Sequence, residues 1–146
     1  MVGGMAGLSH GSSYPSYDLD IVYARDRGNI ERLVESLREV GVRLRGAPDD
    51  LPFLLDVKTI ENGSNFTFVT PHGDFDILGH ADGMPSYEEL KADASVRDIL
   101  GFDIRVAAIE HLIAMKRAAN RPKDRVAVEE YIGLADRQRA DERGRE

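Results

Sequence analysis

The segment that ends in Asp18-Leu19-Asp20-Ile21-Val22-Tyr23 constrains this chain more than any other. Polar and apolar residues alternate there, which predicts a strand whose side chains point to opposite faces in turn. Asp18 and Asp20 therefore share one face, with Cα atoms about 6.6 Å apart. Two carboxylates so close repel each other, and a hard divalent cation with oxygen ligands would relieve that repulsion.

Gly3 and Gly4 precede this strand and open a segment, up to Gly11, that we expect to be a short helix. A glycine-rich turn at the start of a helix lets backbone N–H groups approach an anion, and the helix N-terminus favours negative charge. Taken separately, the glycines fit a flexible chain start and the aspartates fit solvated acids at a sheet edge. Together they predict a phosphate site beside a carboxylate pair, as a metal–nucleotide complex requires. We expect His10 to hydrogen-bond locally and to shape the turn before Asp18.

The arrangement resembles the signature of the nucleotidyltransferase superfamily with the DNA polymerase beta-like fold. Here Val2-Gly3-Gly4 is followed, after thirteen residues, by Asp18-Leu19-Asp20. With His10-Gly11-Ser12, the segment looks most like the small bacterial AbiEii-like and minimal nucleotidyltransferases, some of which are toxins of toxin–antitoxin pairs. The resemblance extends to about Val128. It implies an α+β fold with a small mixed sheet flanked by helices, Mg²⁺ or Mn²⁺ as the cofactor, and an NTP as the substrate.

Length and composition agree with one soluble domain. The chain has 146 residues, of which 42% are hydrophobic and 31% charged, so we expect a nucleotidyltransferase-like domain over residues 1–135 and a polar tail over residues 136–146. No apolar run approaches the ~20 residues of a membrane span, and no secretion signal opens the chain, so we expect a cytoplasmic protein without membrane contact. The net charge of −7 argues against a broad nucleic-acid-binding face. It leaves room for a local basic patch, and one lies near Lys116–Arg125.

Hydrophobic periodicity and turn residues predict the remaining elements. The expected helices are Asn29–Val40 with Gly41 at its end, Tyr87–Ala92 after the N-cap Ser86, Ile109–Asn120, and one that starts at Pro122. The expected hairpins pair Asn65–Thr70 with Asp74–Leu78, and Val96–Leu100 with Asp103–Val106. Three segments are less regular: Val42–Arg45 fits a short strand, Gly46–Asp50 a loop, and Phe53–Val57 a strand or a short buried segment.

The return strand of the first hairpin carries a second pair of acids on one face, Asp74 and Asp76. In the family, a third acid followed by two apolar residues and glycine lies on a strand beside the first pair, and Asp76-Ile77-Leu78-Gly79 matches that pattern. The resemblance therefore implies Asp18, Asp20 and Asp76 as the catalytic and metal-binding residues. In a two-metal site Asp18 and Asp20 would bridge the ions, and Asp76 would ligate the second ion and act as general base. Taken alone, Asp76 also fits an acid on a solvated strand face.

Lys116 lies seven residues after Ile109, in the apolar stripe of its helix. A charge there either snorkels to solvent or points into a cleft that holds an anion. Relatives carry Met-Lys here, followed by Arg-Pro-Lys-Asp, and this chain has Lys116 and Arg121-Pro122-Lys123-Asp124. An ordinary lysine at a helix end is the alternative interpretation. The nucleotide-binding residues that the resemblance implies are Gly3, Gly4, Ser12, Lys116 and Lys123.

Relatives have a helix and a strand before the glycine pair, and here that strand is absent or reduced to Val2. A misassigned start codon, a shortened protein, or a partner chain that supplies the strand would each account for the difference. An open sheet edge next to Asp18–Tyr23 is a pairing hazard, so we expect a homo-oligomer that covers it.

Two functions fit these observations. The first is a metal-dependent nucleotidyltransferase that moves a nucleoside monophosphate from an NTP to an acceptor hydroxyl. The acceptor would be RNA (tRNA in toxin relatives), a protein, or a small molecule such as an antibiotic, and an antitoxin protein is a candidate partner. The second is a degenerate, non-catalytic nucleotide-binding or protein-interaction domain of the same fold.

Overall fold

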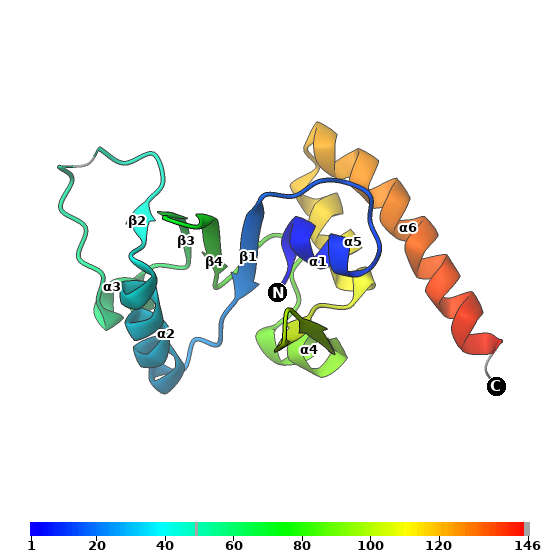
Figure 1. Cartoon of the computed structure of the whole chain (residues 1–146), viewed down its shortest axis with the longest axis horizontal. Helices are drawn as coiled ribbons and strands as arrows, with labels where there is room; N and C mark the ends of the chain where they lie inside the picture. The colour runs from blue at the N-terminus through cyan, green and yellow to red at the C-terminus, as the bar shows by residue number, and fades with distance from the viewer. Residues whose placement is uncertain (49, 145–146) are drawn as a thin grey trace. The chain divides into compact units, whose positions relative to one another are not determined.

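The computed structural model describes residues 1–48 and 50–144 and shows an α+β protein, which confirms the predicted fold class (Figure 1). The chain divides into two compact units: unit 1 comprises Met1–Ser16 with Ala81–Glu146, and unit 2 comprises Tyr17–His80. The extent of a domain over residues 1–135 stays a prediction. Asp49, which falls in the predicted loop Gly46–Asp50, lies outside the described residues, as do residues 145–146 of the predicted tail.

Unit 2 is built on a four-stranded mixed sheet in the order β1-β4-β3-β2. Strand β1 is parallel to β4, and the other two pairs are antiparallel. The predicted hairpin is confirmed as β3 and β4, and the short strand predicted near Val42–Arg45 is confirmed as the two residues of β2. The elements are β1 (Asp18–Val22), α2 (Arg27–Val40), β2 (Arg43–Leu44), α3 (Val57–Asn62), β3 (Asn65–Thr70) and β4 (Gly73–Leu78).

One face of this sheet is apolar and packs against α2 and α3. Phe68 and Ile77 are fully buried there, because alternate residues of β3 and β4 point to the same side. The apolar stripe of α2, with its three- and four-residue spacing, covers that side. The buried cluster consists of Tyr23, Ile30, Val34, Leu37, Ile60, Phe68 and Ile77.

Side-chain caps fix the helices of unit 2. The carboxylate of Asp26 accepts the backbone N–H of Asn29 at the start of α2, and Gly41 ends the helix at a φ of 73°. The predicted helix end at Gly41 is therefore confirmed. Helix α3 begins in the same way, since Asp56 accepts the backbone N–H of Thr59 at 2.7 Å. Helix α3 was not predicted from the sequence.

Unit 1 combines helices with a two-stranded sheet. The predicted second hairpin is confirmed as β5 and β6, and α4 begins with the reciprocal hydrogen bonds of Ser86 and Glu89. The chain start joins this sheet: the amino group of Met1 donates to Arg105 O, and Ala107 N–H donates to Met1 O at 3.0 Å. The elements are α1 (Gly3–Ser9), α4 (Tyr87–Asp93), β5 (Ser95–Ile99), β6 (Phe102–Val106), α5 (Ile109–Ala119) and α6 (Pro122–Arg143).

Helix α6 is longer than the sequence predicts. A polar tail was expected over residues 136–146, and in the described part of that segment the helix continues to Arg143. Arg139 explains part of the extension, because its guanidinium lies 3.1 Å from Glu110 of α5 and 3.0 Å from Asp136. Across residues 1–48 and 50–144, no helix combines the length and the apolar character needed to cross a membrane.

Candidate functional site

Four aspartates lie together on one face of the sheet in unit 2. In the parallel register of β1 and β4, Asp18 is the partner of Asp74 and Asp20 is the partner of Asp76. Neighbouring strands are about 4.8 Å apart and alternate residues about 6.6 Å apart, so the Asp18–Asp76 diagonal is on the order of 8 Å between Cα atoms. These four residues are called the carboxylate face below. The register brings together the three acids that the sequence analysis singled out, and adds Asp74.

The strand pattern explains why these acids share a face. Ile21, Phe75 and Ile77, at the alternate positions, point to the opposite side, where Ile77 is buried and the other two pack against the core; Leu19, at the start of β1, is 40% exposed. Because that opposite side is the buried one, a register slip by one residue would bury the acids and expose the apolar residues. The hydrophobic core therefore holds the carboxylates in place.

Arg45 is a member of this face that the sequence analysis did not single out. It follows β2, and its backbone N–H donates to Thr67 O at 2.9 Å. Its guanidinium contacts the carboxylate of Asp76, and its Nε lies 3.2 Å from Asp74 Oδ2. That Nε is buried and makes no hydrogen bond of good geometry within the described residues. The alternation in Val42-Arg43-Leu44-Arg45 is the signal that could have placed Arg45 opposite its apolar neighbours.

The acids outnumber the cations on this face. Burial raises the pKa of Asp76 above its usual value, the Arg45 guanidinium lowers it, and the charges of Asp18 and Asp74 raise it again. The net effect is a raised pKa, so removal from water and like charge together outweigh Arg45. A carboxyl with a raised pKa holds a proton more readily than an ordinary aspartate does, which suits a proton acceptor.

The donor set fits a hard divalent cation in chemistry, because carboxylate oxygens are the ligands that Mg²⁺ prefers. The side chains, however, are arranged around Arg45. Within residues 1–48 and 50–144, no three His, Asp or Glu side chains are grouped so as to hold a metal ion. For a cation to bind here, the carboxylate of Asp76 would have to rotate away from Arg45 and toward Asp20.

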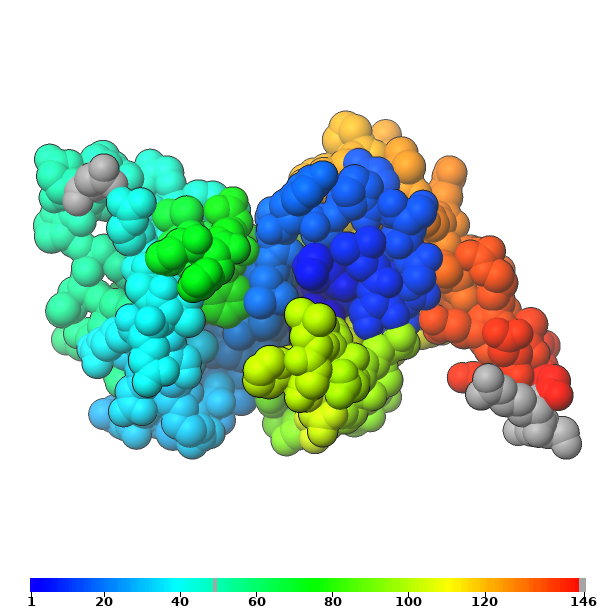
Figure 2. Space-filling view, in the orientation of Figure 1, coloured from blue at the N-terminus to red at the C-terminus, as the bar shows by residue number. Residues whose placement is uncertain are grey.

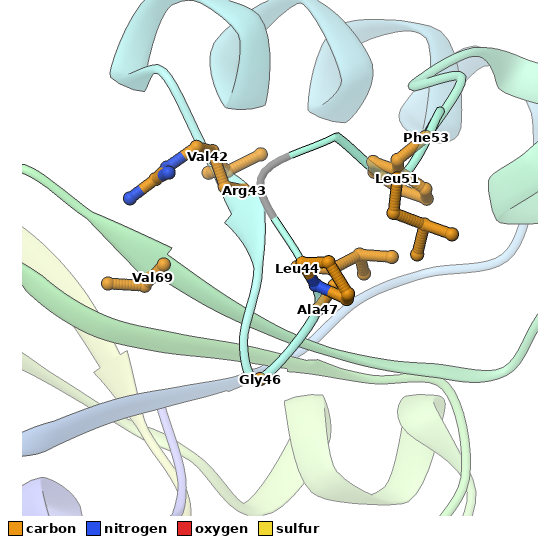
Figure 3. A pocket seen from close by; sticks show the side chains of 9 residues that line it. Val42, Arg43, Leu44, Gly46, Ala47, Leu51, Phe53 and Val69 are labelled. Carbon is orange, nitrogen blue, oxygen red and sulfur yellow. The ribbon is translucent and has the colours of Figure 1, made fainter.

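A pocket of about 360 Å³ lies beside β2, at the sheet edge opposite β1 (Figure 3). Most of the residues that line it are apolar in type, among them Leu44, Leu51 and Phe53, and the side chain of Arg43 extends to the side away from Leu51 and Phe53. None of the four aspartates lines it. The pocket is therefore distinct from the carboxylate face.

The predicted phosphate-binding glycines belong to unit 1. Gly3 has a φ of 69°, and a Cβ on Gly4 would lie 2.3 Å from Ser16 Oγ. Both glycines are thus required by local backbone conformation and packing. Helix α1 has seven residues, which is short for a helix whose N-terminus is to hold an anion.

Ser12, also predicted to bind nucleotide, is tied to α6. Its Oγ donates to Glu130 Oε2 at 2.5 Å, and the backbone N–H and Oγ of Ser13 donate to the other oxygen at 2.6 and 2.7 Å. These hydrogen bonds, that of Ser12 first, lower the pKa of Glu130. Ser12 is nearly buried, so the structure gives it a role in fastening the loop after α1.

Lys116 pairs with an acid inside unit 1. Its Nζ lies 3.3 Å from Asp124 Oδ1, while Arg121 Nε lies 2.6 Å from Asp124 Oδ2. Asp124 is fully buried, and burial alone would raise its pKa. The hydrogen bond from Arg121 and the charge of Lys116 outweigh burial and lower that pKa. Lys123 is exposed, and no hydrogen bond or ion pair joins it to another described residue.

His10 makes contacts far along the chain instead of the predicted local ones. Its Nε2 lies 2.8 Å from Ala107 O, and its Nδ1 lies 3.2 Å from Gln138 Nε2 and 3.3 Å from Arg97. A carbonyl accepts, so Nε2 carries the proton and Nδ1 is the acceptor. Burial, the largest cause, lowers the pKa of His10, which favours this neutral form.

Comparison with known proteins adds no relative: no protein-family model matches this chain, and no curated protein matches it significantly.

Proposed function

We propose that the carboxylate face is the catalytic centre of a metal-dependent nucleotidyltransferase. The observation that carries the proposal is the register of β1 and β4, which sets Asp20 beside Asp76 and Asp18 two residues away on the same face. Three carboxylates on one face of a sheet provide the kind of donor set that a phosphoryl-transfer site uses. The resemblance of the Gly-Gly and Asp-x-Asp pattern to nucleotidyltransferases supports the same conclusion.

In this reaction the acceptor hydroxyl oxygen forms a bond to the α-phosphorus of an NTP, and the bond from that phosphorus to pyrophosphate breaks. Asp18, Asp20 and Asp76 would hold Mg²⁺ or Mn²⁺, which neutralises triphosphate charge and makes the hydroxyl more acidic. Asp76 takes the proton of the hydroxyl, a task that its raised pKa suits. Gly3, Gly4, Ser12, Lys116 and Lys123 are proposed for the triphosphate. Lys116 pairs with Asp124 and Ser12 hydrogen-bonds to Glu130, whereas the side-chain amine of Lys123 has no such partner among the described residues.

The alternative is a non-catalytic domain of the same fold, and Arg45 is the observation in its favour. An arginine bound to Asp76 and close to Asp74 already neutralises part of the carboxylate face. Such a face needs no cation for stability. The two functions differ in whether a divalent cation and an NTP bind at all.

The experiment is transfer from each labelled NTP, with Mg²⁺ or Mn²⁺, to total RNA, to protein and to a small-molecule acceptor such as an aminoglycoside. Asp76→Asn should abolish transfer. Asp74→Asn, the matched control on the same face, should retain it, because Asp74 is the more exposed acid and lies outside the proposed trio. Loss of transfer in both variants to the same degree would contradict the assignment, and absence of any NTP-dependent thermal stabilisation in the wild type would favour the non-catalytic domain.

Partners follow from the same proposal. We propose a cytoplasmic enzyme that binds an NTP and an acceptor such as tRNA or a small molecule, with an antitoxin protein as a further candidate. Strand β1 ends the sheet of unit 2, and an unpaired strand edge invites association. A homo-oligomer is therefore proposed as well, and sedimentation at low micromolar concentration tests it. A monomer at every concentration would contradict this part alone.

A further inference from the structure

The turn that joins α5 to α6 concentrates positive charge in an acidic protein. Residues 116–125 contain five basic residues and one acid, whereas the whole chain has 26 acids and a net charge of −7. This turn stands at the surface of unit 1, where the start of α6 is orange in Figure 2. The five residues, called the basic turn below, are Lys116, Arg117, Arg121, Lys123 and Arg125.

Two of the five cations serve the protein's own interior. Lys116 and Arg121 both pair with the buried carboxylate of Asp124, at 3.3 and 2.6 Å. Asp124 also caps α6, since it accepts the backbone N–H of Arg121 at 3.2 Å. One negative charge is therefore paired with two positive charges, so this cluster still has one positive charge in excess.

The other three cations have no acidic partner among the described residues. The side chains of Arg117 and Lys123 form no hydrogen bond or ion pair with the described residues, and Arg125 donates from Nε to the neutral Asn120 Oδ1 at 2.9 Å. All three side chains belong to exposed residues. None of the ion pairs among the described residues uses their charge.

Two of these three cations, Lys123 and Arg125, occupy positions that are electrostatically unfavourable without a partner. Lys123 and Arg125 lie in and just after the first turn of α6, a 22-residue helix whose N-terminal end carries partial positive charge. Like charges there repel the helix dipole and one another. An external anion would turn this unfavourable arrangement into a favourable one.

Acids near the basic turn leave this excess charge unpaired. Asp82 lies in the turn that packs on α5 through Gly83, and Glu129 follows Arg125 by one helical turn, but no ion pair joins either to the basic turn. Glu130 is occupied by Ser12 and Ser13. The excess charge therefore faces solvent.

We propose that the basic turn binds the phosphodiester backbone of a nucleic acid. Several exposed cations spread along the turn and the start of α6 suit a row of phosphates better than one small anion, which would need a concave site. The acidic remainder of the chain repels a polyanion, so contact is confined to about three phosphates and affinity is modest. That this nucleic acid is the acceptor of nucleotidyl transfer rests on the proposed function, whereas the binding itself does not.

The test is fluorescence anisotropy of a single-stranded RNA of about 16 nucleotides, at low salt, with EDTA and without NTP. The double variant Arg117→Gln/Arg125→Gln should bind about tenfold more weakly, and the slope of log K against log salt should fall from about −2 to about −0.7. The control Arg32→Gln/Arg105→Gln removes the same charge from exposed residues elsewhere and should bind nearly as the wild type does. Asp76→Asn should bind RNA normally, so failure of the proposed function leaves this result standing.

Several outcomes would overturn the proposal: no binding of RNA or DNA by the wild type, equal loss in the control, inorganic triphosphate bound as tightly as RNA, or binding of anionic lipid vesicles in place of nucleic acid. Equal affinity for RNA and DNA would show that the protein contacts the phosphates alone, and a preference for RNA would show an additional contact to the 2′-hydroxyl. Either result supports the proposal. If the double variant loses its cooperative thermal transition, RNA binding is measured with Lys123→Gln instead. The side chain of Lys123 makes no hydrogen bond or ion pair with the described residues, so this variant should fold.

Discussion

The guanidinium of Arg45 reaches across strand β3 to the carboxylate of Asp76. The two residues lie in one row of the sheet, since the backbone N–H of Arg45 donates to Thr67 O and Thr67 is the register partner of Asp76. This ion pair is only partly exposed, so it is screened less than a surface pair. It stabilises the carboxylate face in the absence of a cation.

Arg45→Met should destabilise the protein most at neutral pH. The loss of a charged hydrogen-bond partner for Asp76 costs about 1–3 kcal/mol. The folded-state pKa of Asp76 is raised, so this group opposes folding above that pKa and ceases to do so as pH falls to the unfolded value. Without Arg45 the pKa rises further, and the variant should recover most of its deficit at pH ~3.5. Urea unfolding at both pH values measures this, and an equal deficit at both would contradict it.

Asp20→Asn should abolish nucleotidyl transfer while the protein stays folded. The substitution removes one negative charge from the carboxylate face, where like charges repel. We expect the free energy of unfolding to change by less than about 1 kcal/mol and transfer to fall by roughly 10²-fold or more. Calorimetry with Mn²⁺ should show the loss of cation binding in parallel. An unfolded variant would show that Asp20 is structural.

Asp124→Asn should be destabilising. It leaves Lys116 and Arg121 without their common carboxylate and puts a neutral amide in its fully buried position. Because Arg121 is exposed and Lys116 partly so, neither cation is left as a fully buried charge, and we expect a loss of about 1–3 kcal/mol. Because the pKa of Asp124 is lowered, its contribution is present above the unfolded pKa and is lost as pH falls through the folded one. Asp136→Asn is the matched control, an exposed pair with Arg139 that is worth little. Urea unfolding at pH 7 should separate the two variants clearly.

The sequence predicts which residues of a strand share a face better than it predicts which strands pair with one another. Alternation shows that Asp18 and Asp20 share a side, but the pairing of β1 with β4 depends on which apolar faces pack together over the whole unit. The alternation in Val42–Arg45 indicates the face of Arg45, but it does not show that β2 pairs with β3 and so brings Arg45 into the row of Asp76. Only the tertiary arrangement brings it to Asp76.

Two helices differ from the sequence prediction for identifiable reasons. Helix α3 contains Val57, Thr59 and Ile60, β-branched residues that favour strands, and it forms because Asp56 caps it and Ile60 is buried in the core. The last part of α6 has almost no apolar stripe, and Arg139 holds it to Glu110. Contacts between distant residues override local propensity in both cases.

Gly7→Ala tests the packing of α1 on α6. A Cβ at Gly7 would lie 1.9 Å from the hydroxyl oxygen of Tyr131, which is buried and has little room to move. Overpacking of this kind costs about 1–3 kcal/mol, although alanine is otherwise the better helix residue. Gly133→Ala is the matched control on α6, where the nearest atom to the new Cβ is the flexible end of Arg137 at 3.9 Å. That variant should gain about 0.4–1 kcal/mol, so thermal unfolding should show opposite shifts for the two substitutions, and a stabilised Gly7→Ala would refute the close approach of α1 to Tyr131.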